Sequence, residues 1–117
     1  MILTLTQVAI GGAIGSVLRY LMVVGIGAHV ATLLVNVMGS FLMGVLFISL
    51  AQRTNLSPLL MTGVLGGFTT FSAFSLDAMK LWESGQTLQA GLYVLASVIL
   101  SLVAVALGAA LARGAFA

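Results

Sequence analysis

The chain has 117 residues, of which 62% are hydrophobic and 5% are charged. A soluble domain carries roughly 25% charged residues, so this composition excludes a soluble domain and predicts an integral membrane protein. Because the sequence has no cysteine, one histidine and only four Lys or Arg residues, it also excludes thiol chemistry, a His-cluster metal site and a nucleic-acid surface.

Four hydrophobic segments are long enough to cross a bilayer, which takes about 20 helical residues. The segments are 3–24, 30–51, 58–79 and 88–112. The first has no basic region before it and is expected to be a span, not a signal peptide. Ser57 followed by Pro58 predicts an N-cap and a first helical residue for the third. We therefore expect one all-α membrane domain of four helices over residues 1–117.

The first span carries one charge, Arg19, close to its C-terminal end. An Arg in hydrocarbon costs roughly 2.5–3.5 kcal/mol on insertion scales, so it needs a compensating environment. One interpretation is that the side chain snorkels to the headgroups or bonds to backbone carbonyls. The other is that it supplies a positive field that draws anions into a vestibule.

Polar side chains recur every four residues in the second and fourth spans. They are Thr32, Asn36 and Ser40 in the second span, and Tyr93, Ser97 and Ser101 in the fourth. All of them can donate hydrogen bonds, and none is charged. Such stripes either hold helices together, at about 0.6 kcal/mol per hydrogen bond, or line a polar pathway. The spacing alone does not separate these two interpretations.

The third span contains a stretch that is unfavourable for a continuous helix. Gly66 and Gly67 lack a Cβ atom, and β-branched Thr69 and Thr70 follow them. We therefore predict that the third helix is broken near residues 66–70. Lipid cannot pair the N–H and C=O groups that a break releases, so these groups must face protein, water or an ion. The alternatives are an ion site in mid-membrane and a kinked helix with a glycine packing contact.

Two phenylalanines, Phe71 and Phe74, follow the break at a spacing that puts both rings on one helix face. They are either core residues or a source of positive ring edges for an anion, beside the hydroxyl and amide donors. No Asp or Glu lies at the centre of a span, where a proton-coupled exporter of cations would need one. The carbonyls released at the break, however, suit a cation such as Na⁺.

The four cations divide evenly between the two ends of the predicted bundle. Arg53 and Arg113 lie at the end that holds the termini, whereas Arg19 and Lys80 lie at the other. The positive-inside rule therefore gives almost no orientation. Either the chain inserts both ways and pairs as an antiparallel dual-topology homodimer, comparable to an inverted-repeat transporter, or it is a weakly oriented monomer.

Three stretches carry a resemblance to a known family. They are Gly11-Gly12-Ala13-Ile14-Gly15-Ser16-Val17-Leu18-Arg19-Tyr20, then Asn36 with Gly39-Ser40, and Gly66-Gly67-Phe68-Thr69-Thr70-Phe71-Ser72-Ala73-Phe74. With these, the sequence resembles the Fluc (CrcB) family of fluoride channels over its whole length, and the third stretch is highly specific. One departure is Ala73, where the family often has Thr.

The resemblance implies a passive fluoride channel of the bacterial inner membrane, which is not an enzyme and works as an antiparallel homodimer in lipid. The fluoride pathway would be lined by Asn36, Phe71, Phe74, Tyr93, Ser97 and Ser101. Arg19 would line or support the vestibule. Backbone carbonyls of Gly66 and Thr69 from both subunits would hold a structural Na⁺ at the dimer centre.

Two other functions stay open from the residues alone. A small multidrug-type exporter also has four spans and dual topology, but it needs a membrane-embedded Glu to exchange protons for cationic drugs. A non-transporting membrane subunit would be held together by pairs of small residues such as Gly11/Gly15 and Gly63/Gly67.

Overall fold

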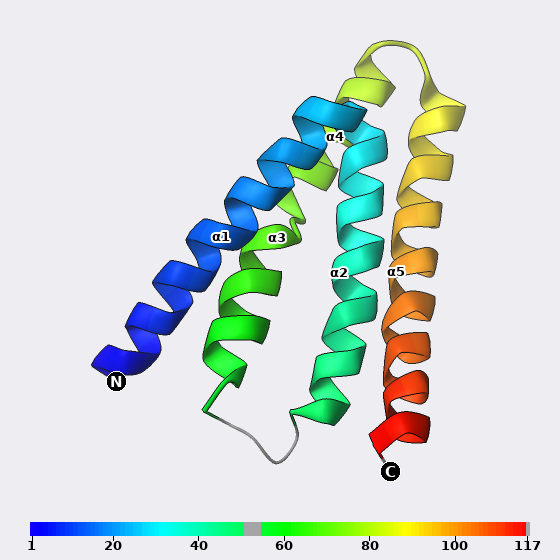
Figure 1. Cartoon of the computed structure of the whole chain (residues 1–117). Helices are drawn as coiled ribbons and strands as arrows, with labels where there is room; N and C mark the ends of the chain where they lie inside the picture. The colour runs from blue at the N-terminus through cyan, green and yellow to red at the C-terminus, as the bar shows by residue number, and fades with distance from the viewer. Residues whose placement is uncertain (51–54, 117) are drawn as a thin grey trace.

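The computed structural model describes residues 1–50 and 55–116, which form helices and no strand. The elements are α1 (Ile2–Ile26), α2 (Ala28–Ser49), the π-helix η1 (Pro58–Leu65), α3 (Gly66–Phe68), α4 (Ser72–Glu83) and α5 (Thr87–Phe116). Four helical stretches, in which η1, α3 and α4 together form the third, are long and apolar enough to cross a membrane. The prediction of four spans is confirmed, and both termini lie at the same end of the molecule (Figure 1).

The third span begins at Pro58, as predicted, but Ser57 does not cap it. The backbone of Ser57 is already helical, with φ −57° and ψ −44°, whereas a capping residue normally has an extended backbone. Its hydroxyl donates to Met61 Sδ at 3.5 Å instead of to a backbone N–H group. The start of this span therefore depends on Pro58 and not on a side-chain cap.

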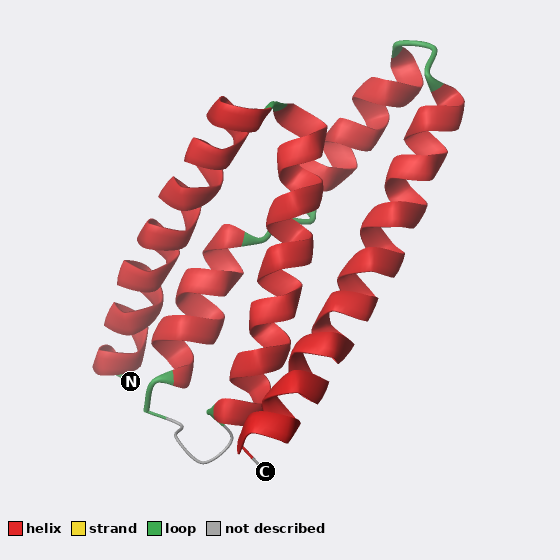
Figure 2. Cartoon of the chain, turned by 45° about the vertical axis from the view of Figure 1, so that its right-hand side comes forward, coloured by secondary structure: helices red, strands yellow, loops and turns green. Residues whose placement is uncertain are grey.

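The helices pack as two neighbouring pairs. α2 lies along α5, and α1 lies along η1 and α3, as both side views show (Figures 1 and 2). Glycines permit this close approach: a Cβ atom on Gly44 or Gly108 would collide with the backbone across the α2–α5 contact, and one on Gly15 would collide with Val64. These seams of small residues, which are typical of membrane bundles, therefore lie within the chain.

The third span is interrupted at residues 69–71, close to the predicted position (Figure 2). Thr69 has an extended backbone, with φ −81° and ψ 157°, whereas Gly66 and Gly67 remain helical in α3. Gly67 is used for packing, because a Cβ atom there would lie 2.6 Å from the Gly12 oxygen. The extended conformation falls to a β-branched residue, which adopts it readily.

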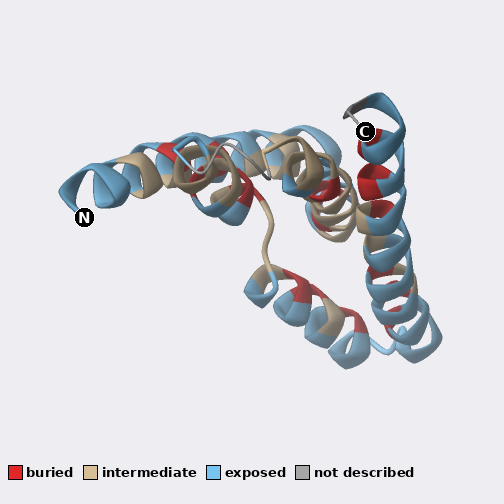
Figure 3. Cartoon of the chain, turned by 90° about the horizontal axis from the view of Figure 1, so that it is seen from below, coloured by how far each residue is buried: buried red, intermediate tan, exposed pale blue. Residues whose placement is uncertain are grey.

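Beyond the interruption, α4 packs on α5 through a small core. Its buried members are Phe74, Leu81, Ala90 and Tyr93. This core joins the helix that follows the interruption to the one that carries the second polar stripe. Large hydrophobic side chains such as Leu21, Phe47 and Leu95 are exposed in the single chain. Exposed positions recur along the helices (Figure 3). Such a surface fits lipid or a protein partner, not water.

Candidate functional site

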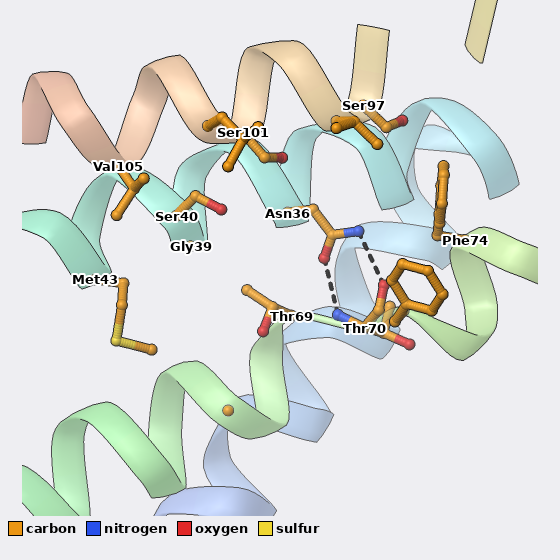
Figure 4. Close-up of a pocket in the computed structure, with 14 residues that line it drawn as sticks. Asn36, Gly39, Ser40, Met43, Thr69, Thr70, Phe74, Ser97, Ser101 and Val105 are labelled. Atoms are coloured by element: carbon orange, nitrogen blue, oxygen red, sulfur yellow. Dashed lines mark hydrogen bonds between the residues drawn. The ribbon is translucent and has the colours of Figure 1, made fainter. Parts of the chain in front are cut away.

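A cleft of about 580 Å³ lies between α2, α5 and the interruption of the third span (Figure 4). Its polar lining residues are Asn36, Ser40, Thr69, Thr70, Ser97 and Ser101. Two residues of each polar stripe and the interruption therefore face one space, whereas Thr32 is not among the lining residues. Of the other residues predicted to form a site, Phe71, Phe74 and Gly66 line the cleft, whereas Tyr93 and Arg19 are not among its lining residues.

Two hydroxyl groups of this cleft have no hydrogen-bond partner. They are Ser97 Oγ and Ser101 Oγ, the buried side-chain polar atoms without a partner among the residues that the structure describes. A helical Ser or Thr commonly bonds to the carbonyl four residues earlier, as Ser49 does to Val45 O at 2.9 Å. Because a buried unsatisfied hydroxyl costs about 1–3 kcal/mol, this pair indicates that the cleft receives a hydrogen-bond partner from outside the chain, such as water, an ion or a second chain.

Asn36 binds the interruption through both ends of its carboxamide. Its Oδ1 accepts the Thr70 N–H at 2.8 Å, and its Nδ2 donates to the Thr70 carbonyl at 2.9 Å (Figure 4). A carboxamide nitrogen carries two hydrogens. The second N–H of Asn36 is therefore available to another acceptor in the cleft.

Phe71 and Phe74 contact each other but lie in different surroundings. Their ring centroids are 5.4 Å apart in an edge-to-face arrangement. Phe74 is 7% exposed and also packs on Tyr93, with ring centroids 5.3 Å apart, whereas Phe71 is 77% exposed in the single chain. A bulky apolar ring left open beside a polar cleft indicates that lipid or a second chain covers it.

Tyr93 lies beside the cleft and not in it. Its hydroxyl donates to Asp77 Oδ2 at 3.3 Å, and its ring makes an edge-to-face contact with His29, with 5.7 Å between centroids. The sequence alone did not single out Asp77 as a site residue. Its position three residues after Phe74 was the signal, because that spacing puts both on the face of α4 that packs against α5.

Arg19 reaches the interruption from α1. Its Nε donates to the Gly67 carbonyl at 3.2 Å, and the residue is half-buried. The structure therefore contains the carbonyl contact, one of the two interpretations of this charge. The contact also places a guanidinium next to the segment that separates α3 from α4.

Any cation at this site would need neutral oxygens as ligands, from backbone carbonyls or from hydroxyl and amide side chains. The residues that the structure describes contain no group of three or more His, Cys, Asp or Glu side chains that could hold a metal. Gly66 and Thr69, the predicted Na⁺ ligands, both line the cleft. The Thr69 hydroxyl donates to Leu65 O at 2.9 Å, and its methyl group occupies the space that a side chain on Gly39 would need.

Comparison with known proteins gives a consistent result. The family model described as "CrcB-like protein, Camphor Resistance (CrcB)" matches residues 6–109. A protein of Cereibacter sphaeroides named "Fluoride-specific ion channel FluC" is 54% identical over 121 residues, which cover 97% of this chain and 98% of the relative. Proteins of the same name from Ruegeria sp. and Paracoccus denitrificans are 51% and 50% identical, with the same coverage.

Proposed function

The chain belongs to the CrcB-like family, and from this membership we infer that it is a fluoride-selective ion channel. It is a multi-pass protein of the bacterial cell membrane, and it transports an ion without catalysing a reaction. The structural observation that best supports this function is the pair of unpartnered hydroxyls, Ser97 Oγ and Ser101 Oγ, on the cleft. Uncharged donors without an acceptor suit a small anion.

Fluoride would exchange part of its hydration shell for donors of the cleft. Ser97, Ser101 and the second N–H of Asn36 can each donate a hydrogen bond to the ion. The positive edges of the Phe71 and Phe74 rings add weak attraction without a fixed charge that would trap it. Conduction requires binding that is favourable enough for entry and weak enough for exit, and selectivity follows from pore width and donor placement.

We also propose that two copies pair in antiparallel orientation, so that a second chain covers Phe71 and closes the cleft. Arg113 lies in the last turns of α5, close to the C-terminus, whereas Arg19 and Lys80 lie near the C-terminal ends of α1 and α4. The two termini share one end of the molecule (Figure 1), and Arg53 is outside the described residues. This distribution of charge gives little preference for one orientation in the membrane.

Thiol labelling tests the dual topology. Because the chain has no cysteine, Gln86→Cys can be labelled with a membrane-impermeant thiol reagent in intact cells. About half of the protein should react for equal insertion both ways, and complete labelling or none would contradict dual topology.

A structural Na⁺ fits the chemistry of the interruption. Unwound backbone carbonyls coordinate Na⁺ in membrane transporters, and those of Gly66 and Thr69 would hold the ion from both copies. When bound, the ion would supply a fixed positive charge between the two interruptions. The lining of the cleft contains no carboxylate that could neutralise this positive charge. The charge would therefore favour an anion nearby.

Liposome efflux tests the proposed function. Vesicles that contain the protein and are loaded with potassium fluoride should release fluoride to an electrode when valinomycin lets K⁺ balance the charge. Vesicles loaded with potassium chloride should retain their anion. No fluoride release from folded, reconstituted protein, or equal release of chloride, would contradict a fluoride-selective channel.

A further inference from the structure

The interruption of the third span redirects two backbone N–H groups to side-chain oxygens. In a continuous α-helix, each N–H donates to the carbonyl four residues earlier. The Thr70 N–H, which would pair with Gly66, donates to Asn36 Oδ1 at 2.8 Å. The Ala73 N–H, which would pair with Thr69, donates to Thr70 Oγ1 at 3.1 Å. The carbonyls of Gly66 and Thr69 therefore lose their helical donors.

Four neighbouring carbonyls keep or gain a donor. Leu65 O accepts the Thr69 N–H at 3.0 Å, and Gly67 O accepts Arg19 Nε at 3.2 Å. On the other side, Thr70 O accepts Asn36 Nδ2 at 2.9 Å, and Phe71 O accepts the Ser75 N–H at 2.9 Å. Phe68 O, which lies between the two, also has no donor among the described residues, but Phe68 is not one of the cleft residues. Of the carbonyls left without a donor at the interruption, those of Gly66 and Thr69 therefore belong to residues that line the cleft.

We propose that Asn36 and Thr70 are positioning residues for the cation site. Each side-chain oxygen binds one N–H group that would otherwise close the helix over a carbonyl of the site. The inference rests on the proposed Na⁺ at Gly66 and Thr69. It assigns the Thr70 hydroxyl a function that depends on accepting a hydrogen bond, which Ser can reproduce and Val cannot.

The arrangement also joins the cation site to the anion pathway through one side chain. The carboxamide of Asn36 uses its oxygen and one N–H on the Thr70 backbone. Its remaining N–H is the one available to fluoride. Loss of the Thr70 contacts would therefore leave Asn36 without its two anchors and weaken the alignment of that donor. Sodium binding and fluoride conduction should therefore change together when the two hydrogen bonds between Asn36 and the Thr70 backbone are weakened.

The test compares Thr70→Val with Thr70→Ser in the full-length reconstituted protein. The primary readout is the rise in melting temperature with Na⁺, titrated against N-methylglucamine at constant ionic strength, because a bound ion stabilises the folded state. Thr70→Val should need roughly tenfold more Na⁺ for half of the rise, an effect of the size that losing a Thr capping bond has on an equilibrium. Thr70→Ser should follow the parent.

Thr62→Val is the matched control, because Thr62 is exposed on η1 in the same span and lies outside the cleft. It should keep the Na⁺ midpoint and the fluoride efflux of the parent. If Thr70→Val is not monodisperse, Thr70→Ala removes the same hydroxyl without a new methyl group, and its midpoint decides the question. If the Na⁺ midpoint of the Thr70 variant without the hydroxyl equals that of the parent, the positioning role is wrong, but the proposed cation site is not affected. If neither the parent nor any variant shows a rise in melting temperature with Na⁺, while the parent still conducts fluoride, the proposed cation site itself is wrong.

Discussion

Replacing Ser97 and Ser101 together by Ala is expected to stabilise the folded protein and to reduce fluoride efflux. Each buried hydroxyl without a partner costs about 1–3 kcal/mol, so its removal should raise the free energy of unfolding. Efflux should fall roughly tenfold to a hundredfold, because hydrogen bonds to a charged group contribute about 1.5–3 kcal/mol each. Equilibrium unfolding in detergent and liposome efflux measure the two effects on the same preparation.

The opposite changes in stability and efflux separate the pathway from interhelical packing. If the two serines held α5 against α2, their loss would lower stability. Ser49→Ala is the control, because the Ser49 hydroxyl already donates to Val45 O at 2.9 Å, and its residue lies outside the cleft. That variant should leave efflux unchanged. A less stable double variant, or one that conducts like the parent, would contradict the assignment of these hydroxyls.

Replacing Phe74 by Ile is expected to lower fluoride efflux about tenfold, the upper range of what an aromatic ring contributes beyond its buried area. Ile preserves apolar bulk next to Tyr93 and Phe71, but it has no positive ring edge to offer an anion. Initial rates of efflux at several fluoride concentrations measure the change. Size-exclusion elution and the melting temperature verify that the protein is folded.

Phe47→Ile provides the matched control for this substitution. Phe47 is 60% exposed on α2 and is not among the cleft residues, so the same change of side chain there should leave efflux at the parental rate. If Phe74→Ile also conducts at the parental rate, the ring edge does not act on the ion. Phe74 would then be a core residue that only joins α4 to α5.

Local chemistry predicted the four spans and the position of the interruption. Length and hydropathy define the spans, and two glycines followed by two threonines disfavour a continuous helix. The reason for each glycine was not predictable, because it depends on contacts distant in sequence. Gly67 is needed where α3 crosses Gly12, and Gly39 is needed where α2 meets Thr69. The dihedral break itself falls on Thr69.

The candidate site was predictable as a set of residues and not as a set of bonds. Spacing by four placed Asn36, Ser97 and Ser101 on polar stripes, and the structure brings them to one cleft. Nothing in the spacing indicated that Asn36 would bind the Thr70 backbone twice, because 34 residues separate the partners. Likewise, unpartnered hydroxyls are recognised only when every neighbouring acceptor is known.

The interruption is supported from two sides, which explains how it can persist in an apolar environment. Arg19 reaches the Gly67 carbonyl from α1, and Asn36 holds the Thr70 backbone from α2. Lipid could satisfy none of these groups. A membrane helix that opens here therefore depends on side chains of two other spans, and those spans also carry the glycines that bring the backbones close.

The reversal potential of the current in a planar bilayer tests the central claim most directly. With different fluoride concentrations on the two sides and equal chloride, the current should reverse at the equilibrium potential of fluoride. A proton gradient alone should not move it, because the proposed pathway has no titratable group that must change charge. A reversal potential that follows chloride or protons would contradict passive, fluoride-selective conduction through this cleft.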